Sequence, residues 1–106
     1  MNSELQNMLN NFKKKLILRY KNDLKSLILY GSQARGDNIE GSDIDVLILL
    51  NTEVNPIKEL RKINRILSNL SLEFNQIISC VFMSKNRFDE EKSPLILNIK
   101  REGIVL

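Results

Sequence analysis

Apolar side chains recur every three or four residues near the start of the chain, which predicts an amphipathic helix over about residues 4–22. Ser3 is followed three residues later by Gln6, the spacing of a capping box, so we expect Ser3 to be the N-cap. A second helix is expected to begin at Asn55-Pro56. Its predicted core face consists of Ile57, Leu60, Ile63, Leu67 and Leu70.

Short apolar runs predict three buried strands, over residues 27–30, 43–50 and 77–83. A shorter helix is expected from Ser93-Pro94 to its C-cap at Gly103, followed by an edge strand at the end of the chain. The charged segment 84–92 is ambiguous. The element order is therefore α-β-β-α-β-α-(β), which predicts an α/β (α+β) fold with one sheet.

The length of 106 residues suits a single domain spanning residues 1–106. The chain has no histidine, which removes Ser-His and Cys-His catalysis and histidine-ligated zinc. The single cysteine, Cys80, excludes an intrachain disulfide, and its apolar surroundings predict a core residue. The polar N-terminus does not resemble a signal peptide, and no apolar run approaches the roughly 20 residues of a membrane span. We therefore expect a cytoplasmic location and no membrane partner.

The net charge of +3 is spread along the chain, and residues 13–15 form the only run of three lysines. Proteins that bind nucleic acid usually carry a denser basic patch with interleaved aromatic residues, and aromatic residues make up only 6% of this chain. A nucleic-acid partner is therefore the weakest hypothesis, and it predicts an affinity that falls steeply with salt. The positive balance is compatible with a polyphosphate ligand.

The polar segment between the first two strands holds three of the four glycines and is long for a hairpin, which indicates a ligand site. Gly31 ends a strand and has no Cβ, so a ligand can approach its backbone closely. Ser32 follows with a hydroxyl and an N–H at the expected start of a helical turn, where anions are favoured. Arg35 lies on the same side of that turn and can pair with a phosphate or a carboxylate.

Asp43 and Asp45 lie two residues apart at the start of the second strand, so both carboxylates point to one face of the sheet. Two carboxylates that close repel one another, and a divalent cation removes the repulsion. Mg²⁺ suits such a pair, because it is bound by one or two carboxylates while phosphate oxygens and water complete its shell. The pair is therefore a candidate metal site.

Gly31-Ser32, followed after ten residues by Asp43 and Asp45, resembles the signature of the DNA polymerase β-like nucleotidyltransferase superfamily. The strings over residues 31–36 and 42–48 look like its smallest members, the minimal nucleotidyltransferases. The resemblance implies a single mixed β-sheet flanked by helices, one or two Mg²⁺ ions, and transfer of a nucleotidyl group, usually from ATP, with release of pyrophosphate. By position, Gly31 and Ser32 would hold the triphosphate, and Arg35 would touch the phosphates or order the loop. Asp43 and Asp45 would be the catalytic metal ligands.

The resemblance also implies a protein partner. Many minimal nucleotidyltransferases are encoded beside a helical HEPN-type protein, and some act as antitoxins of a toxin–antitoxin system by attaching AMP to that partner. The first hypothesis is thus an enzyme that transfers AMP from Mg²⁺–ATP to a hydroxyl of a partner, with a protein as the favoured acceptor. Part of the first helix's apolar stripe can also meet a second subunit, so a homo-oligomer stays open.

Active members of the superfamily usually carry a third carboxylate on the strand predicted here over residues 77–83. No acidic residue occurs there. Glu73 lies just ahead of that strand, but Leu72-Glu73-Phe74 fits a surface turn better. A general base contributes about 10²–10⁴-fold in rate. The second hypothesis is therefore a catalytically silent module of the same fold that binds and restrains a partner protein.

Overall fold

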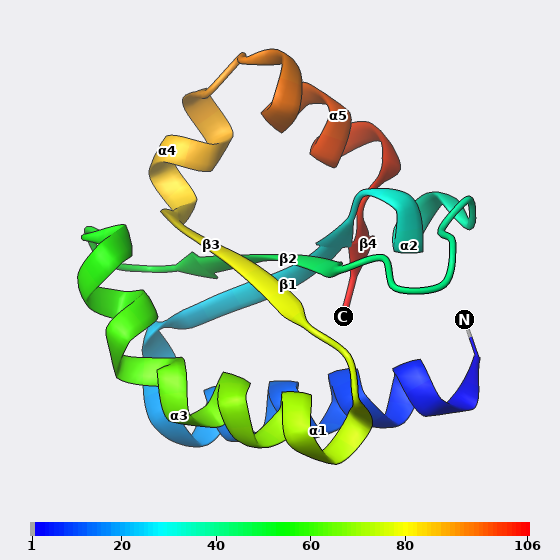
Figure 1. Ribbon diagram of the computed structural model, residues 1–106. Helices are drawn as coiled ribbons and strands as arrows, with labels where there is room; N and C mark the ends of the chain where they lie inside the picture. Colours follow the sequence, from blue (N-terminus) through cyan, green and yellow to red (C-terminus); the bar gives the residue numbers. More distant parts are fainter. Residues whose placement is uncertain (1) are drawn as a thin grey trace.

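A single mixed sheet of four strands lies at the centre of the computed structural model, which describes residues 2–106 (Figure 1). The strands are β1 (Leu24–Tyr30), β2 (Ile44–Leu50), β3 (Ile78–Ser84) and β4 (Ile104–Val105), in the spatial order β3-β2-β1-β4. β2 runs antiparallel to β1 and parallel to β3, and β4 runs antiparallel to β1. The predicted mixed sheet flanked by helices is confirmed.

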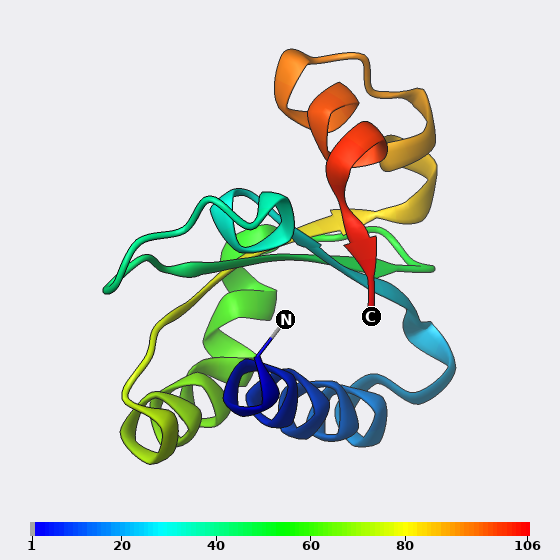
Figure 2. The ribbon, with the colours of Figure 1, turned by 90° about the vertical axis from the view of Figure 1, so that its right-hand side faces the viewer.

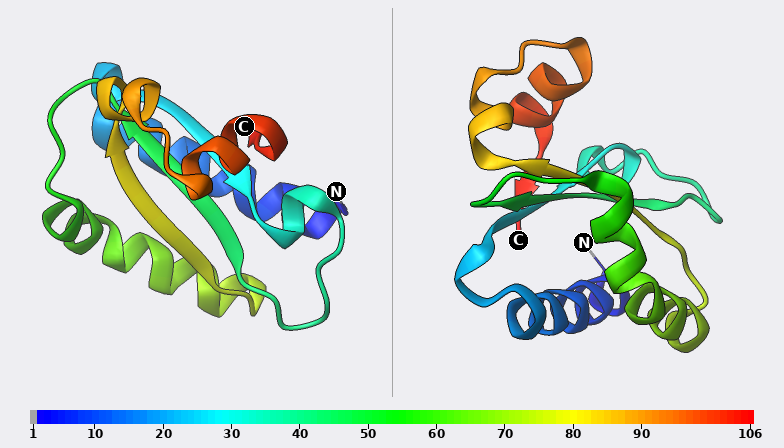
Figure 3. Two further views of the ribbon diagram at one scale, coloured as in Figure 1. Left: turned by 90° about the horizontal axis from the view of Figure 1, so that it is seen from above. Right: turned by 90° about the vertical axis from the view of Figure 1, so that its left-hand side faces the viewer.

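Helices cover the two faces of the sheet unequally. α1 (Ser3–Tyr20) and α3 (Pro56–Phe74) pack together beneath one face, while α4 (Lys85–Glu90) and α5 (Pro94–Glu102) lie over the other (Figure 2). Figure 3 shows from above that α4 and α5 leave the part of this face where β2 begins uncovered. In that region Asp43, just before β2, is exposed, and Asp45 is half-buried.

Two short elements complete the described part of the chain. The 3-10 helix η1 (Lys21–Asp23) links α1 to β1, and the single turn α2 (Ser32–Arg35) follows β1. α4 accounts for most of the segment that the sequence left ambiguous. None of the helices in residues 2–106 is both long and apolar enough to cross a membrane.

Successive side chains along the strands point to opposite faces of the sheet and so contribute to two separate cores. The larger core lies between the sheet and the pair α1 and α3, and the smaller core lies beneath α4 and α5. Along β1, Leu27 and Leu29 point into the larger core, whereas Ile28 points into the smaller one. Along β2, Val46, Ile48 and Leu50 belong to the larger core, and Leu47 and Leu49 belong to the smaller one. β2 is thus buried on both faces beyond its first residues, as its sequence predicts.

The N-cap of the first helix was predicted one residue too late. Asn2, not Ser3, is the N-cap of α1, and its side-chain oxygen accepts a hydrogen bond of 2.7 Å from the N–H of Leu5. Asn and Ser are nearly equal as N-caps, so the capping-box spacing alone could not decide between them. The caps predicted for the later helices are confirmed: the Asn55 side chain accepts from the N–H of Lys58 at 3.2 Å, and α5 lies between its N-cap Ser93 and its C-cap Gly103.

The predicted core face of α3 was partly wrong. Ile63 and Leu70 are buried, but Ile57 is 67% and Leu60 is 40% exposed. Ile57 lies six residues before Ile63, which places it about 120° away around the helix. The position that turns inward in the first part of α3 is Glu59, whose carboxylate accepts a hydrogen bond of 3.0 Å from the Tyr20 hydroxyl. A buried, hydrogen-bonded carboxylate therefore replaces the apolar residue that the pattern favoured.

Candidate active site

The ends of three neighbouring strands bring Tyr30, Asp45 and Ser79 into one row across the sheet. Tyr30 is the register partner of Asp45, and Asp45 is the register partner of Ser79. Directly paired residues in adjacent strands point to the same face. Asp43 precedes β2 on this side, and its Oδ2 accepts a hydrogen bond of 3.2 Å from the Ser79 hydroxyl. The structure therefore places the two aspartates together, at the part of the sheet that α4 and α5 leave uncovered.

Gly31 lies directly against the carboxylate of Asp45. Its backbone has φ 73° and ψ −155°, a region that is essentially restricted to glycine. A Cβ at this position would lie 2.6 Å from Oδ2 of Asp45, far inside any ordinary contact. Glycine is thus required here for its backbone conformation and for the close approach of the carboxylate.

The helical turn expected after Gly31 is confirmed as α2. The N–H groups of Ala34 and Arg35 each donate to the carbonyl of Gly31 at 3.1 Å, and the turn ends at Gly36. Ser32 begins the turn immediately beside the glycine that contacts Asp45. The backbone therefore holds the Gly31-Ser32 pair at the edge of the aspartate site.

Arg35 pairs with carboxylates rather than reaching over the aspartates. Its Nε donates to Oδ2 of Asp37 at 3.1 Å, and one terminal nitrogen lies 3.6 Å from Oε2 of Glu102. The second contact joins α2 to the end of α5. Of the two roles left open for Arg35, ordering the loop is the one that these contacts favour.

Burial and nearby negative charge raise the pKa values of two groups in the site, the Asp45 carboxyl and the Tyr30 hydroxyl. Partial burial raises the pKa of the Asp45 carboxyl, the negative charge of Asp43 raises it further, and Arg35 acts weakly in the opposite sense. Burial, and then the charge of Asp45, likewise raise the pKa of the Tyr30 hydroxyl. A close pair of carboxylates on an open surface is a set of oxygen donors that fits Mg²⁺, which would remove their repulsion.

The described part of the chain offers no third carboxylate to this pair. No group of three or more potential metal-ligating side chains occurs among residues 2–106. Glu73 is exposed, as predicted, but it lies in the last turn of α3 rather than in a loop. Cys80 packs against the larger core on the opposite face, and burial raises the pKa of its thiol to about 12, in agreement with a core role.

Sequence reasoning missed two neighbours of the aspartates, Tyr30 and Ser79. Tyr30 directly precedes the Gly-Ser pair, but only the β1–β2 register shows that it lies beside Asp45. Ser79 lies in a strand whose position was predicted, but its partner in β2 was unknown. A parallel crossover through a helix carries no turn that would fix the register, so the sequence held no signal for this contact.

Sequence comparison identifies a family model and several relatives that match most of this chain. The family model described as nucleotidyltransferase domain matches residues 9–106. A protein of Methanocaldococcus jannaschii with the provisional name protein adenylyltransferase MJ0141 is 42% identical over 82 residues, which cover 77% of this chain and 82% of the relative. A second protein of that organism, provisionally named protein adenylyltransferase MJ0604, is 32% identical over 89 residues, 83% of each chain.

Solved structures share the fold at low identity. A crystal structure of a toxin–antitoxin with AMP-PNP superposes with a TM-score of 0.63 at 18% identity, covering 98% of this chain and 72% of that chain. A nucleotidyltransferase of Sulfolobus solfataricus, so named provisionally, superposes with a TM-score of 0.53 at 17% identity, covering 99% of this chain and 86% of that chain. At these identities the likeness shows the architecture.

Proposed function

Because the chain belongs to the nucleotidyltransferase domain family, we propose that it transfers AMP from Mg²⁺–ATP to a hydroxyl of a partner protein. The observation that carries the proposal is the placement of Asp43 and Asp45 on one open part of the sheet, directly beside Gly31 and Ser32. The provisional name of the relatives, protein adenylyltransferase, supports AMP as the transferred group and a protein as the acceptor. The AMP-PNP in the toxin–antitoxin structure supports ATP as the donor.

Each site residue has a role in this proposal. Asp43 and Asp45 hold the Mg²⁺, and Ser79 orients Asp43 through the hydrogen bond from its hydroxyl. Gly31 and Ser32 hold the triphosphate, with Gly31 leaving room for the phosphates to approach Asp45. Arg35 orders the loop through Asp37 and Glu102.

The transfer step balances without a further reactant. The acceptor oxygen attacks the α-phosphorus of ATP, the bond to the bridging oxygen of the β-phosphate breaks, and pyrophosphate leaves. Bound Mg²⁺ would supply charge neutralisation at the phosphates. Since no third carboxylate lies beside Asp43 and Asp45 among the described residues, the hydroxyl proton passes to water. Transfer is therefore expected to be about 10²–10⁴-fold slower than with a positioned base.

A slow enzyme suits an acceptor that stays bound. We infer that the acceptor belongs to the same toxin–antitoxin pair as this chain and is a helical HEPN-type protein, as the family resemblance implies. The fold neighbours described as toxin–antitoxin complexes support this assignment. In such a complex the partner supplies the acceptor at high effective concentration, which compensates for a low intrinsic rate.

The first test is label transfer from α-labelled ATP with Mg²⁺ to proteins in a host lysate, comparing the wild type with Asp45→Asn. A labelled protein seen only with the wild type establishes nucleotidyl transfer and identifies the acceptor by mass. If purified partner and enzyme together release no pyrophosphate under any condition, the proposed activity is wrong.

The position of Ser79 favours one alternative function. A hydroxyl stands beside Asp43 on the strand where the superfamily usually carries a third carboxylate, which is compatible with a silent module that binds and restrains a partner. That function predicts that Asp45→Asn leaves neutralisation of the partner intact. Loss of protection in an antitoxin assay with this variant would exclude the alternative and favour the enzyme.

A further inference from the structure

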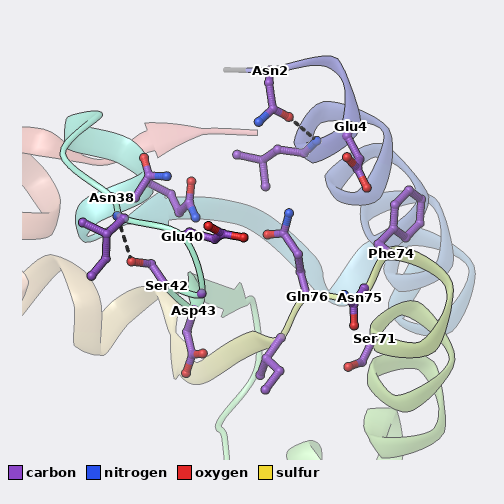
Figure 4. Close-up of a pocket in the computed structure, with 15 residues that line it drawn as sticks. Asn2, Glu4, Asn38, Glu40, Ser42, Asp43, Ser71, Phe74, Asn75 and Gln76 are labelled. Atoms are coloured by element: carbon purple, nitrogen blue, oxygen red, sulfur yellow. Dashed lines mark hydrogen bonds between the residues drawn. The ribbon is translucent and has the colours of Figure 1, made fainter.

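A cavity of about 630 Å³ opens beside Asp43, on the side of the sheet covered by α1 and α3. It lies between the loop of residues 38–42 and the adjacent ends of the two helices (Figure 4). Figure 4 shows Glu40 and Gln76 projecting into this space, with Glu4 at its rim on α1. Gly31, Tyr30 and Ser32 do not line it. Asp43 is thus shared between the cavity and the aspartate site.

The lining of the cavity carries negative charge and no positive charge. Its acidic lining residues are Glu4, Glu40 and Asp43, and the carboxylate of Asp43 points away from Glu40 and Gln76 (Figure 4). None of the lining residues in the described part of the chain is Lys or Arg. No ion pair involves Glu4 or Glu40 among residues 2–106. A triphosphate would be repelled by this lining, whereas a cationic group would be attracted.

Amide side chains supply most of the remaining polar lining. They come from Asn2, Gln33, Asn38, Asn75 and Gln76. Each amide carries both donors and an acceptor, so together they can pair with the N–H and C=O groups of an extended peptide whatever its side chains. Ligand sites typically combine such orienting polar groups with apolar contacts, which Leu5, Phe74 and Ile77 provide here.

We propose that this cavity receives the acceptor segment, a peptide stretch that carries a Lys or Arg close to its hydroxyl-bearing residue. The proposal rests on the proposed function and names its substrate class. Glu4 and Glu40 attract the basic side chain, the amides bind the peptide backbone, and the hydroxyl lies at the rim formed by Asp43. The triphosphate then approaches from the Gly31-Ser32 side, so the two substrates meet at Asp43 from opposite sides.

The test uses binding, which does not depend on catalysis. Short fluorescent peptides with a central serine or tyrosine, flanked by Lys, Gln or Glu, are titrated with the protein in the presence of Mg²⁺ and α,β-methylene-ATP, whose α–β bridge cannot be cleaved. We expect the Lys-flanked peptide to bind several-fold more tightly than the Glu-flanked one. In Glu4→Gln/Glu40→Gln this preference should fall roughly fivefold, the loss expected for two exposed ion pairs.

A matched variant distinguishes the effect of the cavity's own charges on peptide binding from the effect of the protein's net charge. Glu53→Gln/Glu90→Gln removes the same two charges from exposed positions that do not line the cavity, and it should keep the full preference. Equal effects of the two double variants, or no preference in the wild type, would overturn the proposal. Tighter binding of the ATP analogue in Glu4→Gln/Glu40→Gln, with peptide binding unchanged, would assign the cavity to the nucleotide instead, because the variant removes two charges that repel phosphates. A preference for the Lys-flanked peptide without any AMP transfer would support the peptide site and contradict the proposed function. AMP transfer without that preference would support the proposed function and contradict the peptide site.

Discussion

Because Gly31 lies against the carboxylate of Asp45, we expect Gly31→Ala to displace that carboxylate. The new Cβ would lie 2.6 Å from Oδ2 of Asp45, which is about 0.8 Å short of an ordinary contact of 3.4 Å. The carboxylate must therefore move, since the other atoms near the Cβ belong to the same side chain. If Asp45 binds Mg²⁺ as proposed, a displacement of this size is expected to lower the rate of the proposed transfer on the order of 100-fold.

Gly36→Ala is the matched control for backbone strain. Gly36 also has a positive φ, of 80°, but nothing lies within 4 Å of the position that its Cβ would occupy. Both variants place alanine where glycine is preferred, at a cost of about 1–2 kcal/mol for Gly36 and about 1–3 kcal/mol for Gly31. A domain with a stability of about 5–15 kcal/mol remains folded after either change. Only Gly31→Ala disturbs the aspartate site directly.

The assay pairs urea unfolding with Mg²⁺ titration and with initial rates of pyrophosphate release from ATP in the presence of the acceptor. Both variants should lose similar stability, whereas only Gly31→Ala should lose Mg²⁺ affinity and rate. If the two variants keep rates and Mg²⁺ affinities within about twofold of one another, Gly31 does not position Asp45 and the reasoning from the close contact is wrong. Mg²⁺ binding alone gives the same comparison if the protein proves to be a silent module.

Three further predictions concern other contacts. Ser79→Asp places a carboxylate beside Asp43 and should raise the transfer rate by roughly 10²-fold or more, whereas Ser79→Ala in the same assay should not. Tyr20→Phe removes the hydrogen bond to buried Glu59 and should lower the unfolding free energy by about 1 kcal/mol in urea, with the transfer rate unchanged. The Cys80 thiol, with its pKa raised to about 12, stays protonated at mildly alkaline pH, so iodoacetamide should label the native protein at least about tenfold more slowly than the unfolded one. Because this pKa lies above the unfolded value, the stability that the thiol contributes is lost as the pH rises toward 12.

Local patterns were sufficient to predict most of the helices and strands and where Gly31, Asp43 and Asp45 lie in the fold. Gly31 at a strand end, the Asp43-x-Asp45 alternation and the Asn55 cap each depend on residues only a few positions away, so their positions in the fold follow from the sequence nearby. Asn2 and Ser3 show the limit of such patterns, since two adjacent residues of equal capping ability leave the helix start undecided. Glu59 shows a second limit, because its burial depends on Tyr20, which lies 39 residues away.

Cross-strand contacts could not be predicted in the same way. β2 and β3 are parallel and are joined through α3, so no short turn sets their register, and a shift of one residue would turn Ser79 away from Asp45. Tyr30 could in principle have been placed, because β1 and β2 are antiparallel neighbours. The long loop between these strands, however, leaves their register as free as that of β2 and β3.

The unequal covering of the sheet explains how so short a chain combines stability with an open site. The face beneath the strands is buried by the two longest helices, and this larger core allows the opposite face to stay partly uncovered. At the uncovered end, Asp43 and Asp45 raise the energy of the metal-free protein by their mutual repulsion, a cost that neither Ser79 nor Arg35 removes. The same cost would make the proposed Mg²⁺ binding more favourable, since the ion would relieve it. Asp43 also borders the acidic cavity, so a basic acceptor would relieve the remaining charge, and the two substrates would stabilise the site from opposite sides.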